Sequence, residues 1–182
     1  MRTIVSLALF LLALIANSQS KYLTKTGTVS FEASVPSFEQ VRAENKAVTA
    51  IINTDNGEFA ALILVKGFRF KNALMEEHFN ENYAESDKFP KATFKGIIDD
   101  FDPTKLSNEY IEKTIRGTMS FHGQTQNLKD IKISLSKKGN SIVMFGAFEM
   151  KASDFDIEIP KIVSNKVTNE VQVEFNFQLN KK

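Results

Sequence analysis

The sequence predicts an all-β protein of about eight antiparallel strands, with one amphipathic helix among them. Two patterns indicate this class: apolar and polar residues alternate over most of the chain after residue 25, and short turns containing Asn, Asp or Gly separate the alternating segments. The chain also carries 16 Phe, 3 Tyr and no Trp, which predicts a large, purely apolar interior. Strands joined in sequence form an up-and-down barrel or a strongly curved sandwich, and the alternation alone leaves both open.

The first element is a segment typical of a secretory signal peptide. Met1 and Arg2 precede an apolar run over residues 4–16, and the small and polar stretch "ANSQS" follows. We therefore expect a signal peptide over residues 1–18 and a single domain over residues 19–182, located in the periplasm or secreted. The apolar run is too short for a comfortable membrane span, so no integral membrane span is expected after cleavage.

The next segments read as strands with one apolar face. Residues 26–34 and 46–53 alternate regularly, and "TDNG" over residues 54–57 is a turn signal that joins the second strand to "EFAALILVKGFRF" as a hairpin. In this third strand both faces are apolar over residues 59–65. We therefore expect one face to meet the core and the helix that follows to cover the other.

The helix is predicted by its cap and its periodicity. Asn72 can accept hydrogen bonds at the first turn, and Glu76 and Glu77 lie where the helix dipole favours acids. The helix should end near Tyr83 or Ala84, before an extended "KFP" segment. The residues expected to face the barrel are Leu74, Met75, His78, Phe79 and Tyr83.

The second half of the chain returns to alternation. The clearest hairpin lies over residues 128–150 about the turn "KKGN", and Gly117 marks a bulge in the strand before it. The other expected elements are a strand over residues 91–99, a long strand or a strand pair over residues 110–123, a short helical turn or irregular connection over residues 152–165 and a last strand over residues 170–180.

The usual catalytic and metal-binding patterns are missing from the sequence. There is no Cys, and His78 and His122 are too few for an ordinary structural zinc site. Ser120 and His122 alternate on a strand, but no nucleophile elbow surrounds them. With 23 Lys and Arg against 22 Asp and Glu and no basic block, nucleic acid is not an expected partner either. We expect no enzyme activity, no cofactor and no metal.

Three segments resemble the YceI-like family: residues 70–96, 117–128 and 148–162, in that order along the chain. The resemblance implies a lipocalin-like eight-stranded antiparallel barrel with the helix near its mouth, in an exported bacterial protein that holds a polyisoprenoid or similar long-chain amphiphile. Two positions depart from the family pattern. The first strand reads "KTGTVSF" where the family usually has His-Ser, and Asp156 follows "DF" where the family usually has Gly.

The expected function is therefore non-catalytic binding or transport of a lipid of the polyisoprenoid, quinone or fatty acyl type. The alternative is a barrel filled by its own side chains that serves as a structural or protein-interaction module, including a homodimer formed through a strand edge or the helix. The residues expected to line the cavity are Phe59, Phe68, Leu74, Met75, His78, Phe79, Tyr83, Phe94, Phe121 and Phe155.

Overall fold

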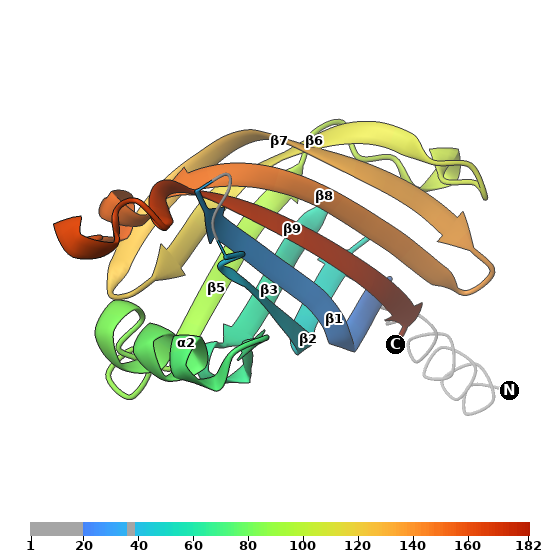
Figure 1. The fold of residues 1–182 in the computed structure, drawn as a ribbon. Helices are drawn as coiled ribbons and strands as arrows, with labels where there is room; N and C mark the ends of the chain where they lie inside the picture. Colours follow the sequence, from blue (N-terminus) through green and yellow to red (C-terminus); the bar gives the residue numbers. More distant parts are fainter. Residues whose placement is uncertain (1–19, 36–38) are drawn as a thin grey trace, which may run out of the picture.

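Eight long strands form a closed antiparallel barrel in the computed structural model, which describes residues 20–35 and 39–182 (Figure 1). The sheet order is β1-β9-β8-β7-β6-β5-β3-β2, and β2 pairs again with β1, so the ring closes. The predicted fold class is confirmed, and the predicted signal peptide lies outside the described residues. The strands are β1 Lys21–Ser34, β2 Arg42–Asn53, β3 Glu58–Leu64, β5 Lys91–Ile98, β6 Ile111–Phe121, β7 Gln124–Lys138, β8 Ser141–Lys151 and β9 Val167–Lys181.

The predicted turns join neighbouring strands. The β2–β3 hairpin has Gly57 at φ +74°, and the β7–β8 hairpin has Gly139 at φ +59°, a backbone region that glycine adopts without steric cost. The register of the β6–β7 pairing shifts next to Gly117, but the bulge lies on β7 and not at Gly117 as predicted: Ile115 pairs with Ile131 and Gly117 with Leu128, which leaves the extra residue on β7, where Asp130 has φ +55°. The hairpin over residues 128–150 was predicted too short, because β7 already begins at Gln124 after a two-residue turn.

The predicted helix consists of α2 (Ala73–His78) and a π-helical turn, η2 (Phe79–Tyr83). The Asn72 cap is confirmed, since its side-chain oxygen accepts a hydrogen bond from the Leu74 N–H at 2.9 Å. A second hydrogen bond holds the segment before the helix against its first turn: the Glu76 carboxylate accepts from the Phe70 N–H at 3.1 Å. Phe70 belongs to β4 (Arg69–Phe70), a two-residue strand that pairs with β2.

The helix lies at the mouth of the barrel, as the resemblance implied, and does not cover the outer face of β3, as the apolar residues of that strand had suggested. Figure 1 shows α2 at the open end on the left, near the β8–β9 connection. On the outer face of β3, Leu62 and Leu64 remain 36% and 54% exposed. The expectation was wrong because the rings of Phe68 and Phe70 draw the helix inward through Phe79, with ring centroids 5.8 and 5.2 Å from it.

Short 3-10 turns complete the connections. The β8–β9 connection, predicted to be a short helical turn or irregular, contains the 3-10 turns η4 (Ala152–Phe155) and η5 (Lys161–Val163) and lies at the same end as the helix (Figure 1). The remaining turns are η1 (Val65–Gly67) and η3 (Pro103–Lys105).

The barrel interior is filled at the end away from the helix. Aliphatic side chains such as Leu135, Ile142 and Leu179 are at most 1% exposed there. A belt of phenylalanine rings follows: the ring centroid of Phe177 lies 5.6 Å from Phe59 and 5.5 Å from Phe175. A Cβ added at Gly27 would lie 2.4 Å from the Phe177 ring, so this glycine makes room for the belt. Open space is thereby confined to the helix half of the barrel.

Candidate functional site

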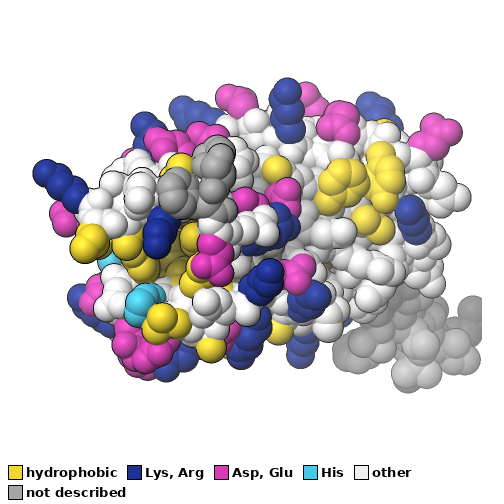
Figure 2. Space-filling view, viewed as in Figure 1, with side chains coloured by type: hydrophobic (Ala, Val, Ile, Leu, Met, Phe, Trp, Pro, Cys, Tyr) yellow, Lys and Arg dark blue, Asp and Glu magenta, His cyan; other side chains and the backbone are white. Residues whose placement is uncertain are grey.

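A cavity of about 510 Å³ opens at the helix end of the barrel. Figure 2 shows it as a hollow with yellow, hydrophobic walls between the helix and the β8–β9 connection. Its walls come from β1, β3, β4, β5, β6, β8 and β9, from α2 and η2, and from the β1–β2 and β8–β9 connections. Its apolar lining includes Val29, Phe31, Phe68, Phe70, Met75, Phe79, Met119, Phe121, Met150, Ile157, Ile159, Val163 and Val171.

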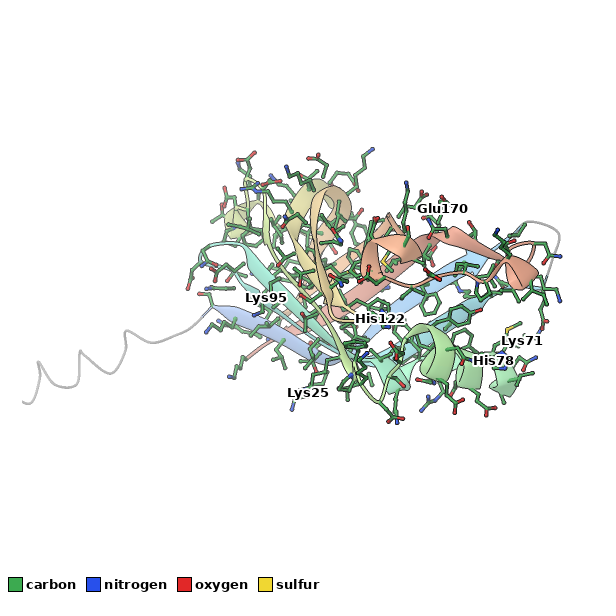
Figure 3. All side chains as sticks on the ribbon, turned by 90° about the vertical axis from the view of Figure 1, so that its left-hand side faces the viewer. Lys25, Lys71, His78, Lys95, His122 and Glu170 are labelled. Atoms are coloured by element: carbon green, nitrogen blue, oxygen red, sulfur yellow. The ribbon has the colours of Figure 1, made fainter. Side chains whose placement is uncertain are left out.

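The charged and polar members of the lining lie at the opening. Glu39, His78 and Lys166 are all exposed and all line the cavity, and Thr168 beside them is half-buried. Figure 3, which faces this end of the barrel, shows His78 on the helix at the rim. His78, which was expected to face the barrel, thus lines the cavity from an exposed position at the mouth. The site has an apolar depth and a polar rim.

Four phenylalanines form one wall of the cavity and hold the helix in place. The Phe79 ring lies 5.2 Å from Phe31, 5.8 Å from Phe68 and 5.2 Å from Phe70, measured between centroids. Phe31 and Phe68 meet edge to face at 5.1 Å, a geometry that adds to the stabilisation from burial alone. The three partners of Phe79 come from β1, β4 and the segment before β4, so one helical side chain ties the helix to two strands.

His122 joins the segment after the helix to the β8–β9 connection. Its Nε2 lies 2.9 Å from Oε2 of Glu85, and its Nδ1 lies 2.8 Å from the backbone oxygen of Phe155. Ser120 is hydrogen-bonded to Thr125 at 2.8 Å between their hydroxyl oxygens. Both ring nitrogens of His122 are engaged by groups other than Ser120, so the two residues do not form a nucleophile–base pair in this arrangement.

The predicted site residues divide into three groups. Phe68, Met75, His78, Phe79, Tyr83 and Phe121 line the cavity as expected. Phe59 and Phe94 lie deeper, around a smaller inner cavity of about 70 Å³. The other two residues, Phe155 and Leu74, are outside both linings.

Phe155 and Leu74 depart from the expectation in opposite directions. Phe155 is 1% exposed and packs against Phe121 with a centroid distance of 5.8 Å, so it supports the wall from behind. Leu74 is 56% exposed, and the expectation that it faces the barrel is wrong. The inward side of the helix carries Met75, Phe79 and Tyr83 at four-residue spacing, which leaves Leu74 at the solvent edge.

Sequence reasoning missed part of the lining. Phe31 lies on the inner face that the alternation in "TVSFEAS" predicts, but it was not assigned to the site. Ile157 and Ile159 come from the connection between β8 and β9. The alternation in "FDIEI" was a signal for them, because residues two apart in an extended segment point the same way.

The shifted pKa values nearest the site belong to a charged cluster on the outer wall. The Arg42 guanidinium donates to Glu174 at 2.8 Å and to Glu32 at 3.5 Å, and its hydrogen bond to Glu174 raises the pKa of Arg42. Burial by itself raises the pKa of Glu32, but hydrogen bonds from Gln40, Ser34 and Arg42 together outweigh it and lower that pKa. Arg42 lies on β2, Glu32 on β1 and Glu174 on β9, so the cluster crosses the seam at which the barrel closes.

Two further features follow from the described residues. Across residues 20–35 and 39–182, no group of three or more His, Asp or Glu side chains is placed to hold a metal ion. Over the same residues, no helix combines the length and the apolar character that a membrane span requires.

Comparison with known proteins identifies the fold independently. Solved structures with this fold include a polyisoprenoid binding domain from Saccharophagus degradans, implicated in plant cell wall breakdown. It is 16% identical with a TM-score of 0.77, and the match covers 90% of this chain and 99% of that one. BcnA from Burkholderia cenocepacia is 17% identical with a TM-score of 0.68, covering 84% and 95% of the two chains. A YCEI protein from Campylobacter jejuni is 14% identical with a TM-score of 0.59, covering 81% and 89%.

No curated protein matches the chain. A family model does match, however, and its description is the YceI-like domain. It covers residues 21–179, from the first residue of β1 almost to the end of β9, and so includes every strand of the barrel, the helix and the mouth. The chain therefore belongs to the YceI-like family.

Proposed function

We propose that this protein binds a long-chain amphiphilic lipid in the cavity at the helix end of the barrel and performs no covalent chemistry on it. One observation carries the proposal: an open cavity of about 510 Å³ has an apolar depth and a rim of Glu39, His78, Lys166 and Thr168. Ligand sites are typically apolar walls with a few polar groups that set the orientation.

The distribution of polar groups indicates how such a ligand would lie. A hydrocarbon chain entering the cavity gains about 0.8 kcal/mol for each methylene removed from water, without any specific polar contact. The polar end would stay at the rim, where His78 and Lys166 offer hydrogen-bond donors and the solvent remains close. This arrangement suits a polyisoprenoid, a quinone with a long tail or a fatty acid.

Family membership and one structural relative support the same class of ligand. The relative from Saccharophagus degradans is described as a polyisoprenoid binding domain, and its likeness covers 90% of this chain. The apolar segment over residues 4–16 supports an exported location. Sequencing the N-terminus of the protein purified from its host tests the export, since cleavage near residue 18 would leave a new first residue.

Mass spectrometry of the native protein, followed by organic extraction, tests the proposal directly. We expect a long-chain lipid to be released from protein purified from its own host, and a fluorescent fatty acid to bind the delipidated protein. If no lipid is released and no long-chain probe binds, the barrel is closed to ligands, and the structural or protein-interaction role becomes the better account.

A matched pair of isoleucines separates binding from folding. Ile159 lines the cavity, while Ile162 lies three residues further along the same connection and is 88% exposed. Ile159→Glu places a carboxylate in the apolar wall, so probe binding should weaken by at least about tenfold. Ile162→Glu introduces the same charge into the same segment and should leave binding unchanged. Equal effects of the two substitutions would contradict the assignment of the cavity as the site.

A further inference from the structure

We infer that Met119 is a gate that sets the longest hydrocarbon chain the cavity accepts. This inference rests on the proposed lipid-binding function. It comes from the relation between two cavities that lie one behind the other: the open cavity of about 510 Å³ at the mouth, here the outer chamber, and the cavity of about 70 Å³ behind it, the inner chamber.

The inner chamber is suited to the apolar end of a chain. Of the residues around it, all but Thr93 are apolar. Its far side is the phenylalanine belt, in which Phe59 lies 6.2 Å from Phe94 and 5.6 Å from Phe177 between ring centroids. A terminal methyl group or the last carbons of a tail would be surrounded there by hydrocarbon.

Five residues line both chambers: Val29, Ile63, Ala92, Met119 and Val173. Val29 and Val173 come from β1 and β9, and the other three come from β3, β5 and β6 on the opposite side of the closed sheet, so this ring of side chains marks the boundary between the two chambers. A chain passing from the outer to the inner chamber must pass this ring of side chains.

Met119 is the adaptable member of the ring. Val29, Ile63 and Val173 are branched at Cβ and hold one preferred rotamer, and Ala92 has no side-chain torsion to change. The unbranched thioether of Met119 has three rotatable bonds and adapts to irregular space. Met119 is also half-buried, and its strand neighbour Phe94 belongs to the inner chamber. Among these five residues, the passage widens through a rotamer change of Met119.

The consequence is a length preference with two regimes. A short chain fills the outer chamber and leaves Met119 in place. A longer chain turns Met119 aside and adds its last carbons to the inner chamber, beyond which the phenylalanine belt stops it. Affinity should therefore rise with chain length, show a step when the passage opens and stop rising when the inner chamber is full.

The test is the affinity of the delipidated protein for a series of unbranched fatty acids of increasing length. In Met119→Ala the chambers join, so the affinity for the longest bound acids should rise by about tenfold relative to the affinity for the shortest. In Met119→Ile a stiff side chain of similar size closes the passage. The affinity for the longest acids should therefore fall, while the affinity for the short acids stays the same. Met150→Ala is the matched control: Met150 lines the outer chamber alone, so this substitution should change all lengths alike.

A second readout uses the unaltered sequence and so does not depend on a variant folding. With carbon-13 in the methionine methyl groups, short acids should shift the NMR signal of Met150, and long acids should shift those of both Met150 and Met119. A length profile that is the same in all three variants, or a Met119 signal that responds to the shortest acids as strongly as to the longest, overturns the gate. If no acid of any length binds the unaltered protein, it is the proposed function that fails.

Discussion

Asp156 holds a left-handed backbone conformation at the end of η4, with φ +56° and ψ +32°. In this region the Cβ of an L-residue crowds the following carbonyl oxygen, and glycine avoids the cost. The family pattern places Gly here, and the structure supplies the reason. Asp tolerates the conformation better than most residues, and its carboxylate accepts a hydrogen bond from Gln124 on β7.

A pair of substitutions isolates the backbone cost at this position. Asp156→Gly and Asp156→Ala both lose the hydrogen bond to Gln124, but only Ala keeps a Cβ. We expect the Ala variant to be less stable than the Gly variant by about 1 kcal/mol, measured by urea unfolding. Asp154, exposed within the right-handed turn, is the control at which Ala should be the better residue. The same order at both positions would contradict the argument.

The placement of the phenylalanines shows how far the sequence could locate the site. Phe59, Phe94 and Phe121 were correctly expected inside the barrel, and for Phe94 the alternation of its strand predicted this, because the side-chain period of a strand is local information. Alternation could not separate the belt from the cavity wall. That distinction depends on the stagger between distant strands, such as the pairing of Val29 with Phe175, which no local pattern encodes.

At the scale of elements, the contacts of the His122 ring connect three segments that are far apart in sequence. Its partners, the Glu85 carboxylate and the Phe155 carbonyl, are both acceptors, so both contacts are hydrogen bonds when each ring nitrogen carries a hydrogen. The ring also lies 4.7 Å from Phe89, in the segment that returns from the helix to β5. The imidazole thereby holds the helical side of the mouth against the β8–β9 connection.

Replacing His122 by Phe should loosen that side of the mouth. The substitution keeps a planar ring but leaves the Phe155 carbonyl and the Glu85 carboxylate without their partner, so we expect the free energy of unfolding to fall by about 2 kcal/mol. Among amides that exchange through local opening, exchange should accelerate over η2, η4 and residues 84–90 and change little in the β7–β8 hairpin. His78→Phe is the control, since His78 is exposed at the rim and should affect stability little. Uniform acceleration across the barrel would argue against a local tie.

The charged cluster at the seam between β1, β2 and β9 should make the folded protein less stable at low pH. Because the pKa of Glu32 is lowered in the folded protein, the ionised carboxylate favours folding. This contribution is complete above the ordinary carboxyl pKa of 4.5 and is lost as the pH falls through the lowered value. Arg42→Gln removes the charge that the cluster shares, so acid unfolding should begin at a higher pH than in the unaltered protein.

The exposure of the Arg42 side chain limits how much stability the Arg42→Gln substitution can remove. The Arg42 side chain is 41% exposed, so at neutral pH the loss should stay below about 1 kcal/mol and should shrink in high salt. Lys46→Gln removes a positive charge from the same strand. Its partner is Glu44 on β2 itself, so the seam is untouched and the acid midpoint should not move. Circular dichroism followed against pH distinguishes the two variants.

The bounds of an element could be predicted from its own residues better than its position in the fold. The helix was predicted to within a residue, because its Asn72 cap and its apolar spacing are both local. Its place near the mouth was implied by the family resemblance alone, whereas the residues themselves pointed to the apolar outer face of β3 as a surface in need of cover. Leu62 and Leu64 remain exposed, and the helix instead follows Phe79 to a cluster assembled from β1 and β4. Local spacing defines an element, whereas its destination depends on contacts that the complete barrel creates.

At the scale of the whole molecule, the barrel is asymmetric along its axis. The end away from the helix contains fully buried aliphatic side chains such as Leu135 and Leu179, followed by the phenylalanine belt. The helix end contains the cavity, the π-helical turn and the 3-10 segments of the β8–β9 connection. Stability should thus reside mainly in the filled half, while the half that meets a ligand is the one that opens locally.

This asymmetry predicts where a bound lipid stabilises the protein. A ligand that binds the folded state alone, at a free concentration about one hundred times its Kd, adds about 2.7 kcal/mol to the free energy of unfolding and raises Tm by about 5–10 °C. Amides that exchange through global unfolding should slow wherever they lie, so the informative amides are those that exchange through local opening. Among these, a fatty acid should protect α2, η2 and the β8–β9 connection and leave the β7–β8 hairpin unchanged. Because the aliphatic core and the belt fill the far end, equal protection of the locally opening amides at both ends would mean that the ligand enters or binds elsewhere.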